Sequence, residues 1–393
     1  MRDATKSVHH PKISEEGYAA LGVPTHRAST IVFPDAEAYA TRSQRDLDSY
    51  SYGLHGTPTQ RVLEAQLTAL ENGLKTVILP SGQAAIAVVM LSCLKPGDHV
   101  LVADNAYPPV IGLCRNFLEP RGIEWSVFEP GIGAGIEGDV RDNTRLIWME
   151  SPGSTTMEIE DVPAITAIAK RRGILTGIDN TWATPLLFKP LDHGVDFSMQ
   201  ALTKYPGGHS DLLMGSVSVN DLDLRKALRD TMRMLGFGVS PDAVQLVLRG
   251  LETMAVRLAH VGRVAGEIAA ELESRDVGPV LFPALASSPG HAIWKRDFTG
   301  ASGLFSVVLP VEHEARLDAA LNGLRYFAIG ASWGGTRSLI APMSVKTSRQ
   351  MPHPHKDRII LRVNIGVEDP SDLREDLDGF FTALGGSQVT CSI

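Results

Sequence analysis

Short apolar runs alternate with amphipathic stretches over much of the first half of the chain. The runs are bounded by glycine, proline, serine or asparagine, whereas the longer stretches place apolar side chains three and four positions apart. Strands that alternate with helices predict a mainly parallel sheet with helices on both faces. We expect strands at 76–79, 99–102, 145–150, 174–178 and 197–201, and helices at 59–70, 83–93 and 162–171.

The pattern changes near residue 240. A long helical stretch at 242–269 is followed by strand-like runs at 304–309 and 358–365 and by a closing helix at 369–384. These elements predict a smaller α/β domain with an antiparallel sheet. The expected division is an N-terminal arm over residues 1–50, a main domain over 51–245 and a C-terminal domain over 246–393.

The first fifty residues show little sustained periodicity, although 23–33 reads as an extended apolar segment. A long arm with few local contacts is either disordered or packed on another chain. The apolar content of this arm favours packing on a partner.

Composition narrows the class of protein. The chain has 393 residues, 44% of them hydrophobic, which is more than one small core requires. The net charge of −8, with no basic block, does not favour binding to nucleic acid. Cys93, Cys114 and Cys391 have neither metal-ligand spacing nor an even number for disulfides, a pattern typical of a reducing compartment. We expect no metal site.

No segment reads as a signal peptide or a membrane span. Residues 1–6 are polar, and the most hydrophobic run, 77–94, is interrupted by Pro80 and Gly82. That run therefore predicts a strand, a turn and a buried helix. We expect a soluble, cytoplasmic protein.

Three polar residues fall at or just beyond the ends of expected strands: Glu150, Asp179 and Lys204. Ligands of parallel sheets bind outside the carboxyl ends of the strands. A lysine that can form a Schiff base and an aspartate that keeps a pyridine nitrogen protonated are what pyridoxal phosphate (PLP) requires. Taken singly, Lys204 also suits an exposed turn and Asp179 a helix cap, so the combination carries the prediction.

Other residues suit the same chemistry. A helix that begins after Ser81 would offer unpaired amides to a phosphate, although an ordinary strand–helix turn is the alternative. The planar fork of Arg362 suits a carboxylate, unless it is a surface arginine. Tyr107 and Trp333 could instead be core aromatics. His209 follows two glycines, and we expect a structural role for it.

Taken together, these segments resemble the Cys/Met-metabolism PLP enzymes of fold type I, and within them the bacterial cystathionine β-lyases. The resemblance runs from residue 23 to about 384. It implies a mainly parallel sheet of the seven-stranded type in a PLP-binding domain, followed by the smaller domain with an antiparallel sheet. The matching segments are 23–33, 52–57, 80–85, 104–107, 150–158, 178–182, 196–210, 332–335 and 361–369.

The resemblance implies a role for each matched residue. Lys204 would carry the Schiff base, Asp179 would pair with the pyridinium nitrogen, and Tyr107 would stack on the ring; these are the expected catalytic residues. Tyr52 would reach the phosphate of a neighbouring subunit. Further cofactor contacts are implied for Gly82, Gln83, Ala201, Thr203, Ser154 and His55, and substrate contacts for Arg362, Ser332, Trp333, Tyr52 and Tyr107.

Two positions depart from the family pattern. Leu54 stands where an arginine often follows the phosphate-binding tyrosine, and we hypothesise that the adjacent His55 assists phosphate binding across a subunit interface. Arg337 stands where a glutamate is usual. This change reverses a charge near the expected substrate carboxylates and would favour a doubly acidic substrate.

The resemblance implies PLP-dependent α,β-elimination of L-cystathionine to homocysteine, pyruvate and ammonia. Trp333 and the Ser-Pro-Gly-Ser run after Glu150 favour the β-lyase branch. The alternatives are a γ-lyase, a cystathionine γ-synthase or an O-acylhomoserine sulfhydrylase, and, from another class, a PLP-binding regulator without catalysis. A homo-oligomer is implied, with a dimer as the minimum and a tetramer formed through the arm.

Overall fold

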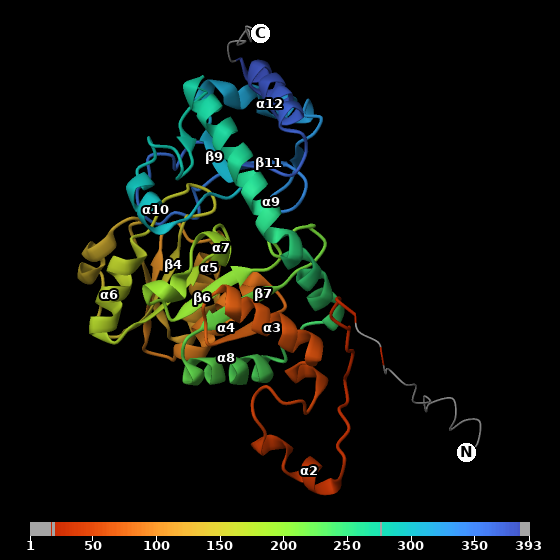
Figure 1. Ribbon diagram of the computed structural model, residues 1–393. Coiled ribbons are helices and arrows are strands. Elements are labelled where there is room, and N and C mark those ends of the chain that lie inside the picture. The colour runs from red at the N-terminus through yellow and green to blue at the C-terminus, as the bar shows by residue number, and fades with distance from the viewer. Residues whose placement is uncertain (1–16, 18–19, 276, 386–393) are drawn as a thin grey trace.

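The computed structural model describes residues 17, 20–275 and 277–385, so Cys391 and the polar residues 1–6 lie outside the described part of the chain. Two layered units are joined by the long helix α9 (Pro241–Ser274), and an N-terminal arm projects from the larger unit (Figure 1). Because α9 runs across residue 245, no break in the backbone marks the expected domain boundary, which stays a prediction.

A seven-stranded sheet forms the larger unit, with strand order β1-β7-β6-β5-β4-β2-β3. Only β7 runs antiparallel to its neighbours, so the expected mainly parallel sheet is confirmed. The strands are β1 (Lys75–Leu79), β2 (His99–Ala103), β3 (Glu124–Phe128), β4 (Thr144–Glu150), β5 (Leu175–Asp179), β6 (Phe197–Ala201) and β7 (Gly215–Val219).

Successive side chains of a strand point to opposite faces of the sheet, so these strands contribute to two hydrophobic cores, one on each face. Val100 and Leu146 pack with helices α4 (Gly82–Cys93) and α8 (Leu222–Leu235) on one face. Leu101 and Ile147 pack on the other face. That face is covered by α3 (Pro58–Leu70), α6 (Val162–Arg172) and the first part of α9.

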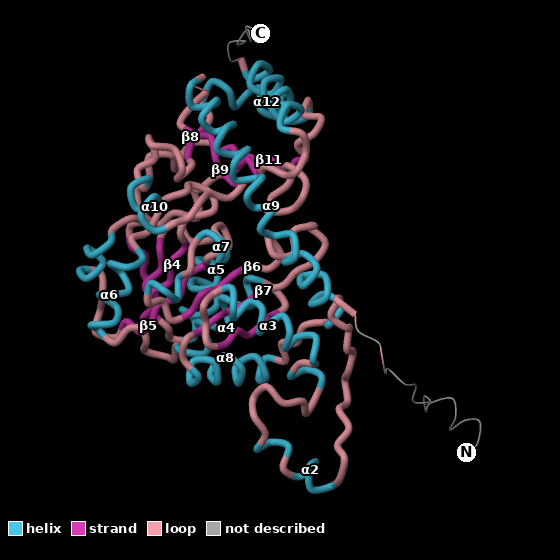
Figure 2. Tube along the Cα trace, in the orientation of Figure 1, coloured by secondary structure: helices cyan, strands magenta, loops and turns pink. Residues whose placement is uncertain are grey.

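The smaller unit contains a five-stranded sheet of order β10-β11-β12-β9-β8. The expectation of an antiparallel sheet is wrong for one pair, since β10 and β11 run parallel and make the sheet mixed. The connection over 330–338 crosses back before β11 begins. The strands are β8 (Val280–Leu281), β9 (Leu304–Val308), β10 (Ala328–Ile329), β11 (Leu339–Met343) and β12 (Ile360–Asn364), and the helices are α10 (His291–Asp297), α11 (Leu317–Asn322) and α12 (Pro370–Leu384) (Figure 2).

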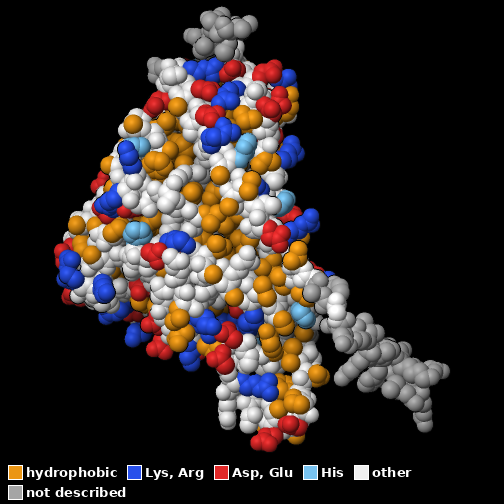
Figure 3. All heavy atoms as spheres, in the orientation of Figure 1, with side chains coloured by type: hydrophobic (Ala, Val, Ile, Leu, Met, Phe, Trp, Pro, Cys, Tyr) orange, Lys and Arg blue, Asp and Glu red, His pale blue; other side chains and the backbone are white. Residues whose placement is uncertain are grey.

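The arm extends away from the sheet and turns back through the short helix α2 (Ala36–Ala40) (Figure 1). As expected, 23–33 is extended without regular structure. Val32 is 88% exposed and Tyr39 is 55% exposed, and apolar side chains lie along the projecting arm (Figure 3). Throughout the described residues, no helix combines the length and the apolarity needed to cross a membrane.

Candidate active site

The expected site residues gather where strands β4, β5 and β6 end and the smaller unit begins. Glu150 and Asp179 are the last residues of β4 and β5 and stand opposite each other in the register. Lys204 lies in the turn that follows β6. The carboxyl edge of the parallel strands therefore carries the polar groups, as the fold class requires.

Lys204 reaches from the larger unit to the smaller one. Its Nζ donates a hydrogen bond to Ser332 Oγ at 2.8 Å and lies 5.1 Å from the centre of the Trp333 ring. Burial, reinforced by the charge of Arg362 and opposed by that of Asp179, lowers the pKa of Lys204 to about 8. A substantial fraction of this amine is therefore neutral and nucleophilic near physiological pH.

Asp179 is held with one oxygen free. Its Oδ1 accepts hydrogen bonds from the backbone amide (3.0 Å) and the hydroxyl of Thr181, and that hydroxyl accepts one from the amide of Ala201 at 2.8 Å. Its Oδ2 accepts from no donor in the described ranges. Burial raises the pKa of Asp179. A buried carboxylate with a vacant oxygen fits a protonated pyridine nitrogen, because a charge-assisted hydrogen bond would offset its desolvation.

Helix α4 presents its N-terminus beside β6. Ser81 Oγ accepts from the amide of Ala84 at 3.1 Å, which leaves the amides of Gly82 and Gln83 for another acceptor. A Cβ atom on Gly82 would lie 3.0 Å from the Cβ of Ala201, so only glycine allows this close approach. The buried Oε1 of Gln83 has no partner among the described groups. This cradle fits the phosphate of PLP.

Tyr107 begins the turn into helix α5 (Pro108–Leu113) and is 43% exposed. Its backbone amide donates to Glu150 Oε2 at 2.5 Å. Burial, with the charges of Asp179 and Glu150, raises the pKa of the Tyr107 phenol, which therefore stays protonated at neutral pH. The ring is thus free to lie against a ligand and to donate a proton.

Arg362 on β12 points into the same region and is 6% exposed. Its guanidinium donates to the carbonyl of Ala331 and, at 3.4 Å, to the carbonyl of Ser154. Burial lowers the pKa of Arg362. Ser332 and the buried Trp333 follow Ala331 directly, so the structure brings together all of the substrate-contact residues expected from this chain except Tyr52.

Tyr52 and His55 lie elsewhere. They flank a 3₁₀ turn (Gly53–His55) at the base of the arm, and none of their described contacts reaches Lys204, Asp179 or Arg362. Tyr52 is 49% exposed, and His55 Nδ1 lies 3.0 Å from Ser51 Oγ. Burial and three nearby arginines lower the pKa of His55. Contacts of Tyr52 and His55 with a cofactor or substrate therefore stay predictions.

Three further expectations concern residues around this centre. The Thr203 hydroxyl is bonded to the backbone of Met214 on both sides, at 3.2 and 3.1 Å, so its contact with a cofactor stays a prediction. His209 is exposed and lies 2.8 Å from the carbonyl of Gly207 through its Nδ1 atom. Arg337 is exposed, and its backbone carbonyl accepts a hydrogen bond from the side chain of Asn364.

Thr181 was not singled out from the sequence, and Glu150 was singled out only as a polar residue at a strand end, with no partner assigned. Thr181 orients Asp179, and Glu150 binds the amides of Tyr107 and Ser154, the latter at 3.0 Å. The spacing of an aspartate two residues before a threonine is typical of a local side-chain turn and could have indicated the first. The second depends on loops far apart in the chain.

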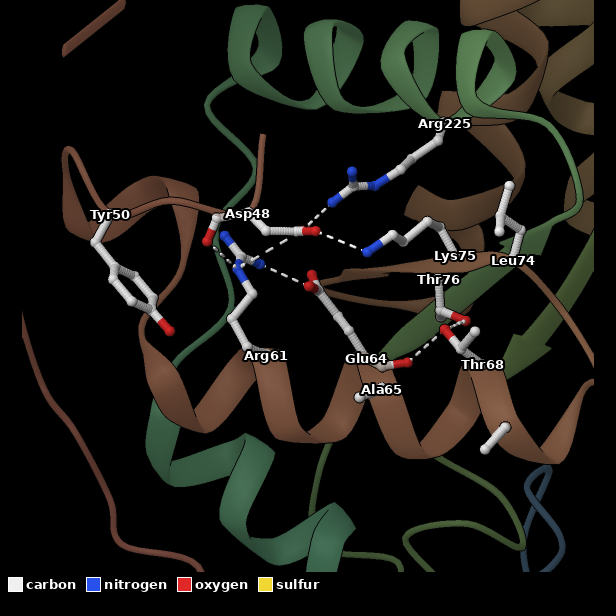
Figure 4. A pocket seen from close by; sticks show the side chains of 11 residues that line it. Asp48, Tyr50, Arg61, Glu64, Ala65, Thr68, Leu74, Lys75, Thr76 and Arg225 are labelled. Carbon is white, nitrogen blue, oxygen red and sulfur yellow. Dashed lines mark hydrogen bonds and ion pairs between the residues drawn. The ribbon is translucent and has the colours of Figure 1, made fainter. Parts of the chain in front are cut away.

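A cavity of about 460 Å³ lies apart from this centre, between α3 and α8 (Figure 4). Its charged groups pair with one another. Asp48 accepts from Lys75 at 2.8 Å and from Arg225, while Arg61 lies 2.6 Å from Glu64. The lining carries three cations, Arg61, Lys75 and Arg225, and two carboxylates, Asp48 and Glu64, so every carboxylate is paired and one positive charge is left over.

Comparison with known proteins decides the family. A model described as Cys/Met metabolism PLP-dependent enzyme matches residues 4–382. The chain belongs to this family. It is therefore a PLP-dependent enzyme of fold type I.

Relatives at similar distance carry different activities. The chain is 38% identical to cystathionine beta-lyase MetC of Escherichia coli (strain K12), covering 97% of this chain and 98% of that one. It is 37% identical to an L-alanine/L-glutamate racemase of Wolbachia pipientis wMel, covering 93% of both. The crystal structure of cystathionine gamma synthase from Xanthomonas oryzae pv. oryzae with aminoacrylate and cysteine matches with a TM-score of 0.86 at 31% identity, covering 94% and 95%. The family is thus shown, whereas the substrate is not.

Proposed function

We propose that the protein catalyses α,β-elimination of L-cystathionine to homocysteine, pyruvate and ammonia. The observation that carries the proposal is the position of the Lys204 amine, 2.8 Å from Ser332 and between the charges of Asp179 and Arg362. Similarity to a cystathionine β-lyase and the Ser332–Trp333 pair support the β-lyase branch. Methionine biosynthesis and a cytoplasmic location belong to the same proposal.

Binding and orientation come first. The substrate α-carboxylate would pair with Arg362, whose planar fork can engage both oxygens. The position of the bound carboxylate would decide which bond at the α-carbon faces Lys204. PLP supplies an electron sink for the pair released when that carbon loses its proton. Asp179 preserves this capacity because its free oxygen holds the ring nitrogen protonated.

Lys204 is the proton carrier of the proposal. With a pKa of about 8, its neutral amine can accept the proton from the α-carbon and return it later. Ser332 fixes the position of the amine before and after transfer. The departing sulfur then takes a proton from Lys204 or from the Tyr107 phenol, whose raised pKa keeps it protonated.

A second copy of the chain would complete the site. The proposed phosphate contact of Tyr52, with assistance from His55, requires a neighbouring subunit, since the turn that bears them makes no contact with Lys204. The exposed apolar side chains of the arm support its packing on a partner. A dimer is the minimum, and a tetramer is our expectation.

A product assay tests the proposal. Purified protein with PLP should release pyruvate and homocysteine from L-cystathionine. Release of 2-oxobutyrate instead would assign the chain to the γ-branch, and loss of optical activity from L-alanine without keto acid would indicate racemisation. Binding of PLP with no turnover of cystathionine, cystine, methionine or O-acylhomoserine would identify a regulator. Each of these three results would overturn the proposal.

A further inference from the structure

Glu150 occupies a position that the proposed reaction leaves without a task. It ends β4 beside Asp179 and is 4% exposed. Both carboxylate oxygens accept backbone amides: Oε2 from Tyr107 at 2.5 Å and Oε1 from Ser154 at 3.0 Å. One buried side chain thus binds two separate loops.

Each of those loops leads to a different part of the active site. The first carries the Tyr107 ring, which is expected to stack on the cofactor. The second carries the carbonyl of Ser154, which accepts from Arg362 at 3.4 Å. Glu150 therefore connects the aromatic face of the site to the arginine that would bind the substrate carboxylate.

The Tyr107 loop and the Ser154 loop are also in direct contact with each other. Asn105 Nδ2 donates to the carbonyls of Glu150 and Glu158 at 3.3 and 3.4 Å. A Cβ atom on Gly153 would lie 2.8 Å from the same nitrogen. The amide side chain of Asn105 packs directly against Gly153, so a displacement of one loop would move the other.

Glu150 is buried beside a second carboxyl, so its ionised form is disfavoured. Burial and the adjacent Asp179 carboxylate raise the pKa of Glu150 to about 8. Each oxygen of the carboxyl keeps a lone pair that can accept a hydrogen bond in either protonation state. The two amide bonds, from Tyr107 and Ser154, therefore fix the distance between the two loops without requiring a charge.

We propose that Glu150 is a positioning residue that sets the spacing between the Tyr107 loop and the Ser154 loop, and through Ser154 the orientation of Arg362. The inference rests on the proposed roles of Tyr107 and Arg362. Glu150 itself touches neither the reacting carbon nor the sulfur. It adds to the proposed function a link between cofactor stacking and substrate binding.

The test is hydrogen–deuterium exchange of the PLP-loaded enzyme, with Glu150→Gln and Glu150→Asp as variants. Glutamine retains the size but turns an N–H toward one of the two amides, so one bond is lost. Losing one buried hydrogen bond and leaving an amide unsatisfied should speed exchange in 104–108 and 152–156 by roughly tenfold to a hundredfold. Aspartate keeps two acceptor oxygens but is shorter, and should give an intermediate rate.

Glu160→Gln is the matched control. Glu160 is also fully buried with a raised pKa of about 8, and its carboxyl accepts one backbone amide, from Gly131 at 3.0 Å. Its side chain bonds neither to the Tyr107 loop nor to residues 152–156, although its backbone amide donates to Ser151 Oγ. Its variant should leave exchange at 104–108 unchanged. In Glu150→Gln, KM for the amino-acid substrate should rise more than kcat falls, because Arg362 is displaced while Lys204 is not.

Unchanged exchange in a folded Glu150→Gln protein would overturn the inference, as would equal loosening in the Glu160 control. If the glutamine variant does not fold, the same exchange measurement is made on Glu150→Asp. Exchange at the wild-type rate in that variant would also overturn the inference. Failure of the proposed function can be told apart from failure of this inference. In the first case the wild-type enzyme would release no pyruvate, while the exchange rates of the variants could still be compared.

Discussion

The amine of Lys204 lies 2.8 Å from the hydroxyl of Ser332, so a residue of the smaller unit holds the reactive nitrogen of the larger one. The same segment carries the carbonyl of Ala331, to which Arg362 donates. The amine and the guanidinium are therefore positioned by neighbouring residues of one connection. Their relative placement depends on that connection more than on either side chain alone.

Replacing Ser332 by alanine removes the acceptor without changing the fold. A neutral hydrogen bond contributes about 1 kcal/mol, so we expect kcat to fall by about fivefold to tenfold with little change in PLP affinity. Steady-state kinetics and a cofactor titration check this. Ser348→Ala, which removes a local bond to the carbonyl of Val345, is the control. Equal kcat in both variants would show that Ser332 does not position the amine.

The pKa of Lys204 predicts how cofactor binding depends on pH. The folded amine titrates near 8, well below its ordinary value of 10.5. The neutral form, which attacks the cofactor aldehyde, therefore makes up half of the amine near pH 8 and levels off above about pH 9. The rate at which cofactor-free protein regains its visible absorbance with PLP should follow that curve.

Lys204→Ala should never regain the band. A rate that kept rising beyond pH 10 would contradict a lowered pKa. A visible band in the alanine variant would remove Lys204 from its proposed role.

Thr181 offers a test of how Asp179 is held. Thr181→Val keeps the shape but breaks the chain of bonds from the amide of Ala201 to Asp179 Oδ1. The amide of Ala201 is left without its acceptor, and the carboxylate keeps only its bond to the backbone amide of Thr181, so we expect PLP affinity to fall by about tenfold. Equilibrium dialysis measures this. Thr299→Val, which alters an exposed hydroxyl bonded to Leu186, should leave the affinity unchanged.

Much of the fold could be predicted because its signal is local. The runs at β2 and β4 are apolar and buried on both faces, which is what a central parallel strand requires. Strands β3 and β7 were missed for physical reasons. β3 is a sheet edge that begins with the exposed Glu124. β7 alternates two serines with core valines, so it has no continuous apolar run, and its Ser218 lies 2.7 Å from the Thr76 hydroxyl.

Some residues of the candidate site could also be predicted from the sequence, whereas others could not. Lys204 and Asp179 were predictable because each directly follows or ends an apolar strand. The tasks of Glu150 and of Arg349 were not, since their partners come from loops distant in the chain. The spacing of apolar residues records which face of an element is buried, but not which loop a buried charge will meet.

Arg349 shows what such a distant contact is expected to contribute. Its side chain is 2% exposed and pairs with Glu158 at 2.5 Å, while the amides of Gln350 and Met351 bind Asp104 at 2.8 and 3.1 Å. This cluster ties the 344–358 segment of the smaller unit to the loops that follow β2 and β4. The hydrogen bond from His353 and the charge of Arg349 together lower the pKa of Glu158 despite its partial burial.

Arg349→Met should therefore leave Glu158, whose side chain is 25% exposed, with His353 as its remaining partner. The loss should lie between those of exposed and buried pairs, at roughly 1–3 kcal/mol, which urea unfolding should report as a lower free energy of unfolding. The exposed pair of Arg296 with Asp161 supplies the control, since Arg296→Met should cost less than about 1 kcal/mol. Similar losses in the two variants would mean that the cluster does not secure the smaller unit to the larger one.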